Sequence, residues 1–138
     1  MKNVFLLSFL MFLFVSCSLD DDSQSFYNEA IPIASITVPE VFEFGNVYPI
    51  SVTYFRPTGC HIFNSFLFEN NNNERTVILV NTVYQDQNCE TFGPEEIIEE
   101  ASFNFQVNEY GTHTFKFWQG EDANGNDLYY IVDIPVAE

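Results

Sequence analysis

The sequence predicts an all-β protein, a β-sandwich of seven or eight short antiparallel strands in one domain. Apolar and polar residues alternate with period two from about residue 31 onward, and no long stretch follows the helical period. Turn-forming residues separate the alternating segments. The 16 phenylalanines and 7 tyrosines provide an aromatic content that only a packed core can use.

Three strands are expected before residue 60, over residues 31–38, 41–44 and 47–55. The third strand alternates, with Ile50, Val52 and Tyr54 on its inward face. Pro49 has no amide hydrogen, so it confines this strand to a sheet edge or limits where the strand can pair.

The middle of the chain is expected to form a hairpin. Residues 61–69 are apolar on both faces, as in a central strand, and residues 75–84 alternate. The asparagines at 70–73 predict the turn between them, because asparagine tolerates positive φ.

Residues 85–96 form the longest irregular stretch, in which Pro94 is able to start one helical turn from Glu95 to Glu100. Three more strands are expected over residues 101–107, 111–118 and 128–136. Their alternation places the following residues inward: Ala101, Phe103, Phe105, Val107, His113, Phe115, Phe117, Leu128, Tyr130, Val132 and Ile134.

The last third of the chain also resembles a known family. The segment Gly111-Thr-His-Thr-Phe-Lys-Phe117, followed by Asp122-Ala-Asn-Gly-Asn126, resembles the end of immunoglobulin-like domains of the fibronectin type III and PKD kind. Their penultimate strand often reads Gly-x-Tyr-x-φ-x-φ, and His113 takes the tyrosine position. The resemblance covers about 30 residues; it implies an immunoglobulin-like sandwich over residues 31–138 and no activity.

The first sixteen residues have the pattern of a secretory signal. Lys2 precedes an apolar run from Val4 to Val15, which as a helix spans only about 18 Å of the roughly 30 Å hydrocarbon core. The stretch Phe14-Val15-Ser16-Cys17 resembles the lipobox of bacterial lipoproteins, with Phe14 in place of the usual leucine. The resemblance implies a signal peptide over 1–16, cleavage before Cys17 and a covalent lipid on that cysteine.

The next five residues, Ser18, Leu19, Asp20, Asp21 and Asp22, resemble the acidic export signal of surface lipoproteins of Bacteroidota. The resemblance implies an outer-membrane protein anchored at the cell surface; the alternative is the periplasmic leaflet. Blocks of like charge also resist folding, so residues 17–30 are expected to form a flexible linker.

The cysteine count agrees with export. Lipidation of Cys17 leaves Cys60 and Cys89, which are expected to form a disulfide in an oxidising compartment. The alternative is a two-cysteine metal site, to which His61 beside Cys60 contributes, although no CxxC or HxxxH spacing is present.

The chain is strongly acidic. It has 20 acidic and 4 basic residues, a formal net charge of −16. Such a surface repels nucleic acid and anionic lipid head groups, so a nucleic acid partner is not expected. The charge either keeps the domain soluble near a membrane or attracts divalent cations or a basic partner.

One candidate metal site lies near the end of the chain. Asp122, Asn124 and Asn126 place oxygen atoms at alternate positions, as calcium requires, but Asp127 stands where a calcium loop needs glycine. The alternative, which we favour, is a hairpin in which Asn124 and Gly125 form a type I′ turn. No other cofactor is expected.

No catalytic motif is present. Glu95, Glu96, Glu99 and Glu100 form the densest acidic group in the domain, and a solvated loop is the favoured interpretation over a pair of catalytic carboxylates. His113 is expected to be a core residue that donates to a backbone carbonyl.

Strand parity directs Trp118 outward or toward the hairpin, where it and Tyr129 on the neighbouring strand are able to form an aromatic platform that binds sugar or protein. The alternative, with equal support, is that Trp118 covers the rim of the core. The leading hypothesis is therefore a lipid-anchored, non-enzymatic binding or accessory module with a glycan or protein partner. The rivals are a structural envelope lipoprotein without a discrete ligand and a small hydrolase or inhibitor that uses the 85–100 loop. The sequence does not indicate an oligomeric state.

Overall fold

The structure, a computed structural model, describes residues 23–85 and 87–138. The expected signal peptide over 1–16, the lipidated Cys17 and the export signal at residues 18–22 lie outside the described residues. Among the described residues, no helix is long and apolar enough to cross a membrane.

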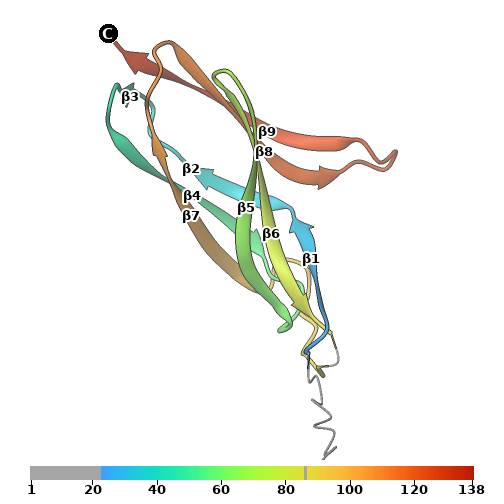
Figure 1. The fold of residues 1–138 in the computed structure, drawn as a ribbon. Helices are drawn as coiled ribbons and strands as arrows, with labels where there is room; N and C mark the ends of the chain where they lie inside the picture. Colours follow the sequence, from blue (N-terminus) through green and yellow to red (C-terminus); the bar gives the residue numbers. More distant parts are fainter. Residues whose placement is uncertain (1–22, 86) are drawn as a thin grey trace, which may run out of the picture.

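The described residues form nine strands in two sheets, so the all-β sandwich is confirmed with more strands than the expected seven or eight (Figure 1). The strands are β1 (Phe26–Ile31), β2 (Ile33–Thr37), β3 (Phe42–Glu43), β4 (Val47–Phe55), β5 (His61–Asn71), β6 (Glu74–Tyr84), β7 (Ile98–Gln106), β8 (Thr112–Glu121) and β9 (Asp127–Ala137).

The larger sheet has the strand order β1-β6-β8-β9-β3, and β5 also pairs with β6. Strand β5 follows one edge of β6 along its whole length, while β8 and β1 share the other edge, β8 at residues 74–77 and β1 at residues 79–84. The smaller sheet has the order β2-β4-β7. Two pairings are parallel, β6 with β8 and β3 with β9, where antiparallel pairs were expected. After β6 the chain crosses to the smaller sheet as β7, and β8 therefore returns to the larger sheet in the direction of β6.

The ordered sheet begins earlier than the sequence indicated. Strand β1 starts at Phe26, inside the expected linker over 17–30, and pairs with β6 from Phe26 opposite Tyr84 to Ile31 opposite Leu79. The expected strand over 31–38 is divided at Pro32, which has no amide hydrogen for a ladder. Ile31 therefore ends a strand of the larger sheet, and Ile33 begins one of the smaller sheet.

Strand β4 has the expected bounds, 47–55, and it is the middle strand of its sheet. It pairs with β7 along its whole length, from Val47 to Phe55. Its pairing with β2 begins only at Ser51, so Pro49 limits where β4 pairs and does not place it at an edge.

The expectation of a central strand over 61–69 is wrong, because β5 pairs with β6 alone. Its two apolar faces have separate explanations. Phe66 and Phe68 meet the ring of Phe103 on β7 at 5.1 and 5.0 Å, which closes this side of the sandwich. On the other face, Ile62 and Leu67 remain exposed.

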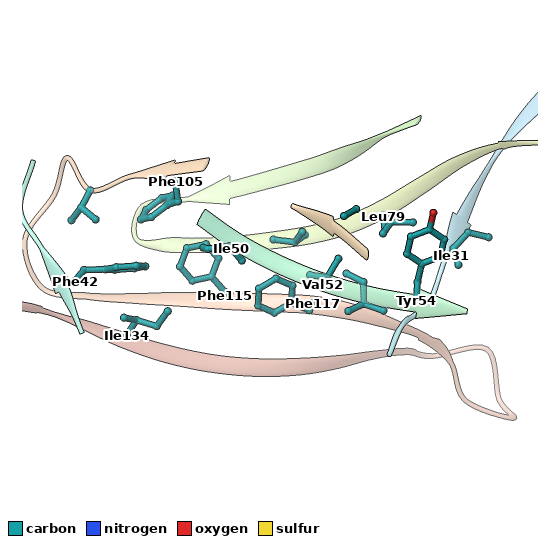
Figure 2. Close-up of a cluster of buried hydrophobic side chains, with 14 of the residues drawn as sticks. Ile31, Phe42, Ile50, Val52, Tyr54, Leu79, Phe105, Phe115, Phe117 and Ile134 are labelled. Carbon is teal, nitrogen blue, oxygen red and sulfur yellow. The ribbon is translucent and has the colours of Figure 1, made fainter. Parts of the chain in front are cut away.

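The core lies between the two sheets and contains most of the side chains expected there. Figure 2 shows Ile50, Val52 and Tyr54 of β4 facing Phe115 and Phe117 of β8. All five are at most 3% exposed. A buried phenylalanine removes about 150–250 Å² from water, which at about 25 cal/mol per Å² stabilises the fold by several kcal/mol before the entropy of ordering is subtracted.

Strand β9 follows its expected alternation but not its expected burial. Ile134 is 1% exposed, whereas Tyr130 and Leu128 are 50% and 46% exposed. Figure 1 shows the reason, since the hairpin of β8 and β9 extends past the strands of the smaller sheet. The alternation therefore continues beyond the core that it would face.

Residues 93–96 form a tight turn and not the helical turn considered from the sequence. The amide of Glu96 donates to the carbonyl of Gly93 at 3.2 Å, and Glu95 has a φ of 62°. Strand β7 starts at Ile98, directly opposite Phe55 of β4, so strand pairing replaces the helix.

Candidate functional site

The expected disulfide between Cys60 and Cys89 is present, with Cα atoms 5.5 Å apart. It ties the start of β5 to the loop that follows β6. At the same end, the amide of Gln85 donates to the carbonyl of Ser25 at 2.8 Å. We call this end, defined by Ser25, Cys60, Tyr84 and Cys89, the disulfide end of the sandwich (Figure 1).

Three loops meet at the opposite end, and we call residues 44–46, 72–73 and 107–111 the loop end. The amide of Gly45 donates to the carbonyl of Val107 at 2.8 Å. The side-chain amide of Asn73 donates to the carbonyl of Tyr110 at 3.0 Å. These bonds fix the three loops relative to one another.

Two aromatic rings lie exposed on these loops. Phe44 and Tyr110 stack with centroids 4.3 Å apart and planes 5° from parallel, and their residues are 47% and 65% exposed. Both rings are next to glycines with positive φ, Gly45 at 83° and Gly111 at 95°, which only glycine adopts without strain. The two turns therefore hold two aromatic rings exposed to water, whereas such side chains are more often buried.

A cleft of about 140 Å³ also opens at the loop end, and mostly polar side chains from three segments line it. Neither ring of the stack lines this cleft, but Tyr110 directly follows the lining residue Glu109. The lining residues are Asn72, Asn73, Arg75, Phe105, Gln106, Asn108, Glu109, His113 and Phe115. Carboxamides are the commonest side chains among them, and each offers both a hydrogen-bond donor and an acceptor.

Arg75 is the cation of the cleft. Its guanidinium carbon lies 4.8 Å from the ring centroid of Phe105 and 5.6 Å from that of Phe68, and its Nε donates to Asn70 Oδ1 at 2.7 Å. Burial lowers the pKa of Arg75 from its usual value. Across residues 23–85 and 87–138, no carboxylate forms an ion pair with this guanidinium.

The other basic side chains of the described region are paired. Arg56 Nη1 lies 3.5 Å from Glu99, and Lys116 Nζ lies 3.7 Å from Glu74. Among the lysines and arginines of the described residues, Arg75 alone has no carboxylate partner, although the chain has an excess of carboxylates.

His113 forms the inner wall of the cleft and is 6% exposed. Its Nε2 lies 3.0 Å from the carbonyl oxygen of Glu109, and since a carbonyl only accepts, Nε2 carries the proton. Its ring packs edge-on against Phe42 and Phe105. The expectation of a core histidine bonded to a backbone carbonyl is confirmed.

The expected platform residues Trp118 and Tyr129 are directly opposite each other on β8 and β9. Both are half-buried. Trp118 Nε1 donates to Asp127 Oδ1 at 2.8 Å, and Lys116 Nζ lies 4.9 Å from the Tyr129 ring centroid. The two rings form a local surface on the outer face of the sheet, away from the cleft-forming loops.

Asp122, Asn124 and Asn126 lie in the hairpin between β8 and β9. Asp122 Oδ1 accepts the backbone amides of Asn124 at 2.8 Å and Asn126 at 2.9 Å, and these bonds, that of Asn126 first, lower the pKa of Asp122. The carboxylate of Asp122, which calcium would need as a ligand, already accepts hydrogen bonds from amides of the hairpin itself. No cluster of three or more metal-ligating side chains occurs in the described part of the chain.

The hairpin prediction is confirmed, but its turn is not of type I′. The amide of Gly125 donates to the carbonyl of Asp122 at 3.0 Å, and that of Asp122 donates to the carbonyl of Asn126 at 2.8 Å. Gly125 has a φ of 80°, while Asn124 is absent from the positive-φ residues of the described region. This is a type I turn followed by a glycine bulge.

A second hollow, of about 200 Å³, lies near the disulfide end, and Glu99, Glu100, Tyr54 and His61 help to line it. A hollow lined by loop glutamates is the feature that the hydrolase or inhibitor hypothesis requires. Of the two glutamates, Glu99 is already engaged, because it pairs with Arg56. Burial, followed by the charge of Glu99, raises the pKa of Tyr54.

His61 is held on both sides of its ring. Its Nε2 lies 2.9 Å from Glu29 Oε2 and its Nδ1 lies 2.7 Å from Thr58 Oγ1. It is 7% exposed and faces no cysteine thiol, since Cys60 is in the disulfide. This histidine therefore links β1 to the start of β5.

Sequence reasoning missed Phe44, Tyr110 and Arg75. A usable signal was present for the two aromatic residues, because each stands beside a glycine between alternating segments, where a ring cannot enter the core. Arg75 had no comparable signal, since its lack of an anionic partner depends on the tertiary structure. No protein-family model, curated protein sequence or solved structure matches this chain significantly.

Proposed function

We propose that this protein is a lipid-anchored, cell-surface module that binds a glycan without enzymatic action, and that the ligand occupies the cleft at the loop end. The observation that carries the proposal is that the exposed stack of Phe44 and Tyr110 and a cleft lined by carboxamides share the loop end, where Asn73 of the cleft donates to the carbonyl of Tyr110. Sugars bind proteins through aromatic faces on their C–H surfaces and through polar side chains on their hydroxyls.

The arrangement of the chain supports display of this cleft. An anchor at Cys17 would connect to the sandwich from the disulfide end, because the described chain enters the sheet there, with Phe26 of β1 opposite Tyr84. Strand β6 runs 11 residues from Glu74, at the loop end, to Tyr84. At about 3.3 Å per residue this places the cleft roughly 35 Å from the anchored end.

The rival site on the same fold is the half-buried Trp118–Tyr129 surface, which would bind a protein partner. It predicts that removal of the loop-end aromatic rings leaves binding unchanged. A structural envelope lipoprotein without a ligand is the rival from another class, and it predicts that the unmodified protein binds no glycan.

A glycan-binding assay with single alanine variants of the full chain separates these functions. Tyr110→Ala and Phe44→Ala should each lower affinity for the bound glycan about fivefold, since a stacking ring contributes about 1 kcal/mol beyond its buried area. Tyr130→Ala is the matched control, because Tyr130 is 50% exposed on β9 and lies outside the loop end. Loss of binding in Trp118→Ala alone would move the site to the other surface, and no glycan binding would refute the proposal.

The anchor has its own test. Cys17→Ala should release the protein from membranes, and replacement of Asp20, Asp21 and Asp22 by alanine should lower protease accessibility on intact cells. Continued membrane association of Cys17→Ala would contradict the anchor, and unchanged accessibility would contradict the export signal.

A further inference from the structure

Arg75 provides the cleft with a positive charge that the fold itself does not neutralise. Nε is bound to Asn70, while Nη1 and Nη2 make no hydrogen bond to any of the described residues. The rings of Phe68 and Phe105 hold the guanidinium in place. A guanidinium fixed in this way has two donors in the fork geometry that matches a carboxylate.

We propose that the ligand of the loop-end cleft is an acidic sugar, a uronic acid residue whose carboxylate pairs with Arg75. This inference rests on the proposed function, since it names the class of glycan that the cleft accepts. The carboxylate supplies the anion that Arg75 lacks in the described structure. The carboxamides of Asn72, Asn108 and Gln106 face the same cleft and suit the sugar's hydroxyls.

The net charge of the whole protein further limits the class of acidic glycan that the cleft accepts. With a net charge of −16, the surface repels densely charged chains such as nucleic acids or polysulfated glycans. A single carboxylate that enters the cleft meets Arg75 at contact, whereas the more distant carboxylates are screened beyond about 8 Å at physiological salt. A glycan with isolated uronic acid residues therefore fits better than a continuous polyanion.

A carboxylate at the end of a peptide would satisfy Arg75 equally well. The exposed Phe44–Tyr110 stack and the carboxamide lining favour a sugar, because they match a ring with C–H faces and several hydroxyls. Glu109 also lines the cleft and repels any carboxylate there, so an acidic ligand binds only where its carboxylate pairs with Arg75. The oxygens of Glu109 are able to accept hydrogen bonds from the sugar's hydroxyls.

The test compares methyl glycosides of glucuronic, galacturonic and mannuronic acid with those of the parent neutral sugars, by titration calorimetry or NMR on the full chain. At least one uronide should bind about ten- to hundredfold more tightly than its neutral parent, the effect of one charge-assisted hydrogen-bonded pair. Arg75→Gln should remove this preference and leave the weaker binding of the neutral sugar. Arg75→Lys, which keeps the charge but loses the fork, should retain part of it.

Lys116→Gln is the matched control, because it removes the same charge from a side chain on the outer face of β8 that pairs with Glu74. It should leave the preference unchanged. Equal binding of uronide and parent to the unmodified protein, or an equal loss of both in Arg75→Gln, overturns the uronic acid and leaves the glycan module standing. Binding of neither sugar class by the unmodified protein, with any tested glycan, overturns both. The comparison on unmodified protein decides the matter even where Arg75→Gln does not fold.

Discussion

Removal of the disulfide should lower the free energy of unfolding by an amount that depends on the length of the loop that the disulfide closes. Cys60 and Cys89 are separated by 29 residues, and closing a loop of that length in the unfolded chain corresponds to about 3.6 kcal/mol at 25 °C. The domain described here has about 115 residues, so its entropy of unfolding near the midpoint is about 0.24 kcal/mol/K. The double variant Cys60→Ala, Cys89→Ala should therefore melt about 15 °C lower.

The assays are thermal unfolding for the melting temperature and urea unfolding for the free energy, both followed by the fluorescence of Trp118, the single tryptophan of the chain. Cys17→Ala is the matched control, because it removes a cysteine that takes no part in the disulfide, and its midpoint should not move. Contacts such as the bond from the Phe92 amide to the Pro57 carbonyl, at 2.9 Å, should keep the native loop in place without the covalent link. A loss below about 1 kcal/mol in the double variant would refute the reasoning from chain entropy.

Three further changes test local features of the fold. Asn81 is 0% exposed and its side-chain amide makes no well-formed hydrogen bond among the described residues, but it lies close to the Tyr54 hydroxyl, whose pKa, raised by burial, it tends to lower. Asn81→Leu should therefore raise the free energy of unfolding in urea by about 1 kcal/mol, and a decrease would show that the contact with Tyr54 satisfies the amide in the native protein. Glu95 has a φ of 62°, so Glu95→Gly should raise the same free energy by about 0.5–1 kcal/mol, and a loss would contradict the strained turn. Asp122 should hold the hairpin only while ionised: its folded pKa is lowered, so the stabilisation is present above the usual value of 3.8 and fades as pH falls through the folded value. The amides of Asn124 and Asn126 should lose protection from hydrogen exchange in Asp122→Ala and in acid, and unchanged protection in the variant would contradict the role of the carboxylate.

Alternation predicted the strands well wherever a strand faces the core along its whole length. Strand β4 has the expected bounds, and Phe115 and Phe117 of β8 are buried as expected. On β9 the same alternation indicated burial of Tyr130, which is half exposed because the hairpin leaves the core behind. Periodicity reports which residues share a face of a strand, and tertiary structure decides whether that face is covered.

Pairing partners were harder to predict than strands. The apolar residues on both faces of β5 indicated a central strand, but β5 is an edge strand. On one face Phe66 packs against Phe103 of the other sheet, and on the opposite face Leu67 stays exposed. The parallel contact of β6 with β8 depends on the path of the chain through the smaller sheet, which no local pattern encodes.

In the candidate site, too, features that follow from local sequence patterns could be predicted and features that depend on tertiary structure could not. The disulfide followed from the cysteine count, and the outward direction of Trp118 followed from strand parity, whereas its place directly opposite Tyr129 depends on the register of β8 with β9. The cleft could not be predicted, because its lining comes from distant parts of the sequence, within residues 72–75, 105–109 and 113–115, and its cation is notable only for the ion pair it lacks. Loop ends assemble such sites from residues that share no spacing in the sequence.

Backbone amide shifts measured by NMR during titration with a bound glycan test the central claim most directly. The account predicts that the largest changes fall at residues 44–46, 72–75 and 105–113, which surround the loop-end cleft. Changes centred on Trp118 and Tyr129, or on the hollow beside His61, would contradict it.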